Sequence, residues 1–164
     1  MSAKAVIAVL ADLIKVHKEL NQIAVEKTEV VKKGEMAALD MLIKKESPFI
    51  HHLGKLEEKR VLAVEQFINE KGLVTEDVTM KQLIERAPQE EQTLLLKLYR
   101  ALLSEIDILK KNNQLNQQLI EDSLRFVNLS LDLLTPEPEE VTYQRPTKNQ
   151  YETGSSRSIF DSKA

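Results

Sequence analysis

The feature that most constrains this chain is a long stretch without any residue that breaks a helix. After Pro88 the sequence contains no glycine or proline until Pro136, and apolar residues recur at helical spacing. The pattern predicts one very long helix, or two collinear ones, over residues 88–134. An unbroken helix of that length would measure about 70 Å, more than a compact domain of this size spans. It must project beyond its neighbours or be covered lengthwise by them.

Two earlier apolar stripes predict a pair of long helices before this stretch. The first spans residues 6–31, with Ser2 as a candidate N-cap and Gly34 as the residue that ends the helix. Gly72 follows the second stripe. Because one glycine joins the two, we expect an antiparallel hairpin. The second stripe comprises Met36, Leu39, Ile43, Ile50, Leu53, Leu56, Val64 and Phe67.

The second helix contains a local conflict at Ser47-Pro48. A proline in a helix interior removes a backbone donor and clashes with the preceding turn, at a cost of roughly 3 kcal/mol. Two outcomes are open: the helix is kinked there, or it restarts with Ser47 as N-cap and Pro48 at its first position.

A short helix is predicted between the hairpin and the long last helix. Thr79, Leu83 and Ile84 indicate it, and Ala87-Pro88 ends it. With 30% charged and only 4% aromatic residues, the composition favours helices over sheets. We expect an all-α fold, a long antiparallel hairpin plus a long third helix in a coiled-coil-like three-helix bundle, as one domain over residues 1–134.

The composition changes from Thr135 onward. Prolines arrive with Glu, Thr, Gln, Ser and Gly, and the helical periodicity disappears. Residues 135–164 are therefore predicted to be a flexible tail. Its few apolar residues suit short docking contacts, and they are Val141, Tyr143, Tyr151, Ile159 and Phe160.

Charge and hydropathy disfavour several partners. A net charge of −3 with mixed signs offers no basic face for nucleic acid. The first apolar run, residues 5–14, contains Asp12 and is too short to span a bilayer, and nothing after it resembles a signal-peptide cleavage site. The absence of cysteine fits a reducing compartment, so we expect a cytoplasmic protein without stable membrane insertion.

Nothing in the sequence indicates catalysis, a metal or a cofactor. The four glycines are isolated, so there is no glycine-rich phosphate loop and no Gly-x-Ser-x-Gly. His17, His51 and His52 lack a glutamate three residues before them, which the metal sites of helical bundles use. We therefore expect that the protein is not an enzyme and has no catalytic residue.

Residues 110–118 depart from the pattern of a bundle, because six of the nine are amides. Asn113 and Asn116 fall where the apolar stripe would continue, so they either specify register or face something polar. Alternatively, this is a solvated stretch where the helix outruns its neighbours.

Beyond this polar stretch, residues 119–134 become apolar around more than one face. A single hairpin cannot cover all of these residues, which suggests a partner that binds by a helix-in-groove mode. A normally buried third helix is the alternative.

Taken in order, three features resemble the FlgN family of flagellar type III export chaperones over nearly the whole chain. The first is Leu56-Glu57-Glu58-Lys59-Arg60 in the early hairpin. The second comprises Asn116, Leu119, Ile120, Ser123, Leu124, Phe126 and Val127. The third is a tail with Tyr151, Gly154, Phe160, Asp161, Lys163 and Ala164. Pro48 departs from the uninterrupted second helix expected of the family.

The resemblance implies a chaperone that binds hook-filament junction proteins in the cytoplasm, prevents their premature assembly and delivers them to the flagellar export gate. The cargo-binding residues would be Leu119, Ile120, Leu124, Phe126, Val127 and Leu131. A tail tyrosine, Tyr143 or Tyr151, would contact the gate. The competing hypothesis is a structural or regulatory coiled-coil protein that homodimerises through its last helix.

Overall fold

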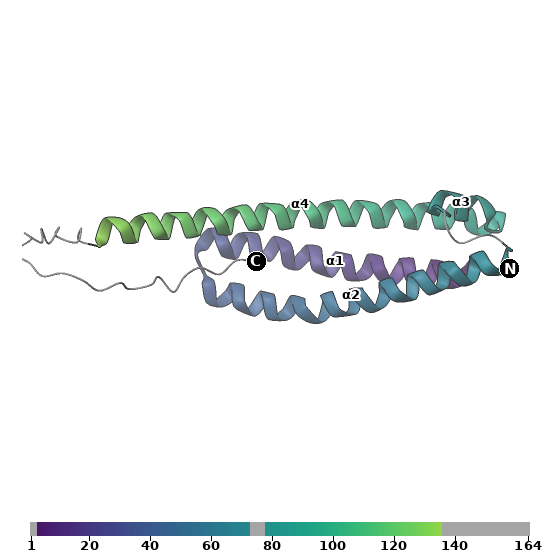
Figure 1. The fold of residues 1–164 in the computed structure, drawn as a ribbon, viewed down its shortest axis with the longest axis horizontal. Helices are drawn as coiled ribbons and strands as arrows, with labels where there is room; N and C mark the ends of the chain where they lie inside the picture. Colours follow the sequence, from purple (N-terminus) through teal and green to yellow (C-terminus); the bar gives the residue numbers. More distant parts are fainter. Residues whose placement is uncertain (1–2, 73–77, 136–164) are drawn as a thin grey trace, which may run out of the picture.

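The computed structural model describes residues 3–72 and 78–135, and within them the chain forms helices alone. The elements are α1 (Lys4–Lys33), α2 (Met36–Glu70), α3 (Met80–Arg86) and α4 (Gln89–Leu134) (Figure 1). The predicted all-α fold is confirmed, and α4 is one continuous helix of 46 residues. The predicted tail lies outside the described residues except for Thr135.

Gly34 ends α1, as predicted, in a left-handed conformation with φ of 73°. The N–H of Gly34 donates to the Val31 carbonyl and that of Glu35 to the Val30 carbonyl, each at 3.1 Å. These bonds satisfy carbonyls that the end of a helix leaves without partners. At the other end of α1 the N-cap position is Ala3, without a side-chain cap. The predicted cap, Ser2, lies outside the described residues.

Pro48 lies inside α2, which continues through it without a break. A restart capped by Ser47 is therefore wrong, and Figure 1 shows instead that α2 curves along its length. The physical reason is that Pro48 is exposed, so water can solvate the Lys44 carbonyl whose helical donor the proline removes.

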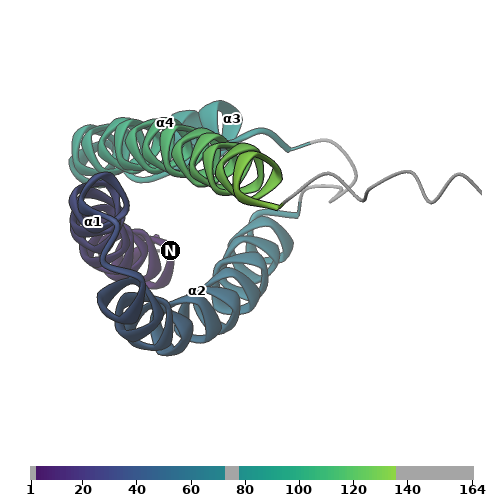
Figure 2. The same cartoon turned by 90° about the vertical axis from the view of Figure 1, so that its left-hand side faces the viewer.

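The hydrogen bonds between α1 and α4 show that these helices run parallel in one constant register. They join Ala3 to Glu91 and Thr28 to Asn116, both 88 residues apart. From the turn at Gly34, α2 runs back along α1 in the opposite direction (Figure 1), and the ion pairs Lys27–Glu46 and Glu26–Lys45 join the two helices. α1 packs against both α2 and α4, whereas α2 and α4 make little contact (Figure 2). The predicted hairpin is thus confirmed, with α1 as the central helix.

The main core lies in the half of the bundle that contains α3. Its most deeply buried side chains include Leu10, Leu13, Leu83 and Leu95. The short helix predicted from Thr79 is confirmed: Thr79 and Gln82 form a reciprocal capping box, with bonds of 3.3 and 3.1 Å. This cap fixes the start of α3 and holds Leu83 in the core.

The apolar stripe of α2 divides into two parts. Leu56 and Phe67 are buried in the core, in agreement with the sequence pattern. Met36, Ile43 and Ile50 are exposed, although they belong to the same stripe. The reason is that α4 leaves α2 uncovered on that side of the hairpin.

Candidate functional site

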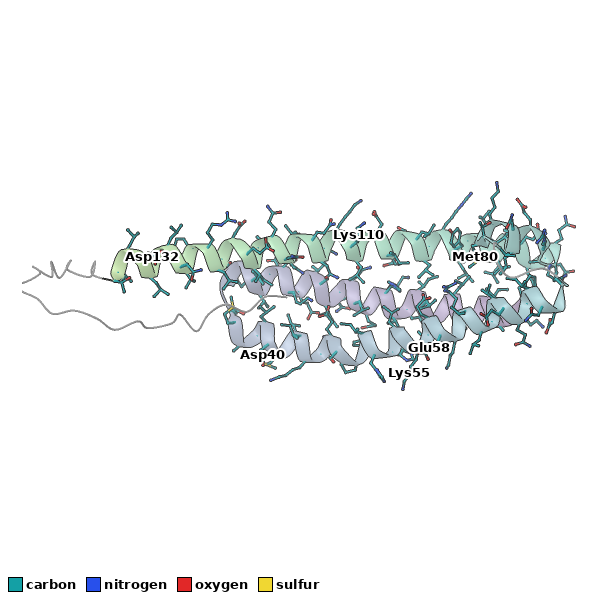
Figure 3. All side chains as sticks on the ribbon, in the orientation of Figure 1. Asp40, Lys55, Glu58, Met80, Lys110 and Asp132 are labelled. Atoms are coloured by element: carbon teal, nitrogen blue, oxygen red, sulfur yellow. The ribbon has the colours of Figure 1, made fainter. Side chains whose placement is uncertain are left out.

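The end of α4 extends beyond the hairpin. Thr28 pairs with Asn116, 88 residues later, and at the same offset Lys33 at the end of α1 lies level with residue 121 of α4. The remaining 13 residues, 122–134, have no α1 beside them and extend for about 20 Å. Figure 1 shows this projecting end, and Asp132, labelled in Figure 3, lies on it.

The projecting end carries four of the six predicted cargo-binding residues, all exposed. The exposed fractions are 58% for Leu124, 72% for Phe126, 50% for Val127 and 57% for Leu131. These values rule out a normally buried third helix for this segment. The other two predicted residues, Leu119 and Ile120, are half-buried at the end of the bundle.

Sequence reasoning left three exposed apolar residues of the same segment out of the site. Leu129, Leu133 and Leu134 are 57, 87 and 79% exposed. The signal that would have found them is the end of α1, because every apolar residue of α4 beyond that point lacks a neighbouring helix.

Most apolar residues of α4 from Leu119 to Leu134 form two adjacent stripes, which begin at the end of the bundle and continue along the projecting end. Leu119, Phe126 and Leu133 recur every seven residues on one of them. Between them, Ser123 and Ser130 bond their hydroxyls to the carbonyls four residues earlier, at 2.8 and 2.9 Å. Because these hydroxyls are already satisfied, the surface can be covered by apolar groups. The other stripe, with spacings of four and three residues, comprises Ile120, Leu124, Val127, Leu131 and Leu134.

The polar stretch before this end contains one buried amide, Asn116, which is 4% exposed. Its Nδ2 donates to the Ala24 carbonyl at 2.8 Å, and its Oδ1 accepts from the Thr28 hydroxyl at 2.5 Å. Asn116 therefore fixes the register of α4 against α1. Asn113 and Gln117 are exposed and therefore solvated, but α4 has not outrun its neighbours here, because α1 still lies beside it.

A second polar contact between α1 and α4 was not anticipated from the sequence. Asn21 donates through Nδ2 to the carbonyl and the carboxylate of Glu105, at 3.0 and 2.8 Å. Asn21 and Asn116 thus bond the same two helices at points well apart along the bundle.

The geometry of the histidines points to structural or surface roles. His17 is buried, and its Nδ1 donates to the Leu13 carbonyl at 2.8 Å. His51 and His52 are exposed on α2. Within residues 3–72 and 78–135 no three acidic, histidine or cysteine side chains gather where they could hold a metal ion. No helix in this part of the chain combines the length and hydropathy needed to cross a membrane. Tyr143 and Tyr151 lie outside the described residues.

Comparison with known proteins identifies the family. No solved structure matches this chain. A protein of Bacillus subtilis (strain 168), described as uncharacterized protein YvyG, is 32% identical over 164 residues, which cover 100% of both chains. The model of the FlgN protein family matches residues 1–150. This chain belongs to the FlgN family.

Proposed function

We propose that this protein is a cytoplasmic flagellar export chaperone that holds hook-filament junction proteins on the projecting end of α4 and delivers them to the export gate. Membership of the FlgN family supports a chaperone role in flagellum assembly. The observation that carries the choice of site is the exposure of Leu124, Val127 and Leu131 on a helix end without a neighbour.

The stripe on this end suits a helical cargo segment. Its apolar residues alternate at spacings of four and three, the pattern with which one helix packs lengthwise on another. Full burial of one such side chain contributes roughly 1.5–3 kcal/mol. A cargo helix that covers Leu124, Val127 and Leu131 would therefore be held without any covalent step.

The mechanism is substitution of one helical pairing for another. A junction protein whose terminal helices assemble by coiled-coil pairing would pair with α4 instead and would be kept from premature assembly. Delivery requires release at the gate, for which a contact through Tyr143 or Tyr151 of the tail is proposed. A tail that orders only on binding has lower affinity for a given contact area, which favours release.

The test is calorimetric titration of the full chain with a purified hook-filament junction protein. The double change Leu124→Asp and Val127→Asp places two charges on the stripe and should abolish one-to-one binding. Circular dichroism must show an unchanged helical signal, because both residues are exposed. No binding by the unmodified protein would refute the proposal.

The competing homodimer makes a different prediction from the same surface. If two copies cover each other's projecting ends, sedimentation should show dimers in dilute samples, and Leu124→Asp should convert them to monomers. A cargo chaperone should sediment as a monomer with and without this substitution.

A further inference from the structure

The N-terminal half of α2 carries an exposed apolar stripe that no described helix covers. Met36, Ile43 and Ile50 follow one another at intervals of seven residues and are 53, 50 and 54% exposed. A seven-residue repeat keeps side chains on one line along a helix that packs lengthwise on another. Single apolar residues scattered over a surface need no explanation, but three exposed apolar residues aligned along one helix do.

The inner end of this stripe meets the α4 stripe that contains Ile120, and Ile43 and Met36 continue it along the same side of α2. Ile50 of α2 and Ile120 of α4 line one groove together, at the end of the bundle that the hairpin turn closes. Because α2 and α4 run in opposite directions, the path from Ile50 to Met36 along α2 and the path from Ile120 to Leu134 along α4 lead the same way. The groove therefore opens directly onto the projecting end.

We infer that the cargo segment is a single amphipathic helix that lies in this groove, contacts α2 and α4 together, and completes a four-helix bundle. This inference rests on the proposed chaperone function and extends its site from one helix to two. Heptad-spaced apolar residues on both walls match one helix that inserts its own apolar side chains between them.

The side chains at the inner end of the groove indicate which part of the occupant should be polar. Lys27 lies 2.8 Å from both carboxylate oxygens of Glu46, and the two side chains are only 14 and 12% exposed. This pair is neutral as a unit, and the adjacent side chains of Asn113 and Gln117 are amides. The occupant should therefore present amide or hydroxyl groups there and leucine-like residues towards Leu134.

Charge on the groove wall adds one further requirement. Glu121 accepts from the Gln117 amide at 3.0 Å but forms no ion pair within the described residues. Lysine or arginine beside Glu121 would complement it at the edge of the contact. From Asn113 to Leu134 the path is 21 residues, about 32 Å, so the occupant is a helix of roughly three heptads.

The deciding experiment compares three double variants in calorimetric titrations with a hook-filament junction protein. Ile43→Asp with Ile50→Asp tests the α2 wall. Met41→Asp with Leu62→Asp is the matched control, because these α2 residues are 70 and 64% exposed and lie off the seven-residue line that Ile43 and Ile50 share. The third variant carries the two α4 changes, Leu124→Asp and Val127→Asp.

We expect the α2-wall variant to bind at least ~10-fold more weakly than the control, as for loss of central interface contacts. Equal affinities of these two variants, with binding lost only in the α4 variant, would overturn the two-walled groove and leave the proposed function standing. Absence of binding by the unmodified protein would overturn both. Circular dichroism verifies that each variant remains helical.

A second measurement does not depend on changes in affinity. The chain has no cysteine, so Ile50→Cys and Leu62→Cys each accept one environment-sensitive fluorophore. Addition of the junction protein should shift the emission to shorter wavelength at position 50 and leave position 62 unchanged. A position 50 spectrum that stays constant at saturating junction protein would refute the inference.

Discussion

Replacement of Asn116 by alanine tests whether this buried amide fixes the register of α4. The substitution removes two hydrogen bonds, one to the Ala24 carbonyl and one from the Thr28 hydroxyl. Each contributes about 1 kcal/mol net to stability. Thr28 keeps a partner, because its hydroxyl also lies 3.1 Å from the Ala24 carbonyl. No buried donor is therefore left without a partner, and the expected loss is about 2 kcal/mol.

The matched control is Asn113→Ala, three residues earlier on the same helix. Asn113 is exposed, so its replacement brings the same gain in helix propensity without the loss of a buried bond. The difference between the two variants isolates the buried contacts. Urea unfolding followed by circular dichroism should give a lower free energy of unfolding for Asn116→Ala by about 2 kcal/mol.

Asn116→Leu should separate stability from specificity. Leucine fills an apolar position and should retain or raise stability, while removing the polar contact that disfavours other registers.

A difference below roughly 0.5 kcal/mol between Asn116→Ala and Asn113→Ala, the range of ordinary surface substitutions, would refute the assignment of Asn116 as a register-fixing residue.

Three further substitutions test local features of the fold by the same urea measurement. Pro48→Ala should raise the free energy of unfolding by about 1–3 kcal/mol, because it restores a donor to the Lys44 carbonyl inside α2; a decrease would contradict a continuous helix there. Gly34→Ala should lower the free energy of unfolding by about 1 kcal/mol, because φ at this position is 73°. The loss should be no larger, because the added methyl group meets no other atom; no change would mean that the turn relaxes. Lys27→Met should lower it by roughly 3 kcal/mol by leaving Glu46 without its partner, and the added change Glu46→Leu should recover most of the loss; equal losses in the single and double variants would show that the ion pair is not the cause.

The sequence predicted the helices well because their signals are local. Gly34 marks a turn that requires positive φ, and the apolar period of residues 89–134 continues without a breaker, so both features follow from neighbouring residues. The outcome at Pro48 did not follow, because it depends on whether the tertiary fold leaves the Lys44 carbonyl within reach of water.

The site was predicted only in part, because one of the features that define it is local and the other depends on the tertiary fold. The excess of apolar residues after Gln118 is visible in the chain, but the point at which α4 becomes uncovered depends on its offset of 88 residues from α1. That offset also decides which amide is buried, so Asn113 and Asn116 could not be told apart. The α2 wall was missed because Ile43 and Ile50 continue the stripe that becomes core at Leu56.

The fold separates the residues that stabilise it from those proposed to bind cargo. Leu10, Leu83 and Leu95 bury the core beside α3, whereas Leu124 and Leu131 project from the opposite end of the bundle. An apolar surface that contributed to the core would be covered before cargo arrived, and its exposure would require partial unfolding. A helix extended beyond its neighbours avoids this conflict, because the register fixed at Asn21 and Asn116 keeps the end free while the core remains closed. At the proposed site, cargo would therefore bind and leave without the bundle having to open.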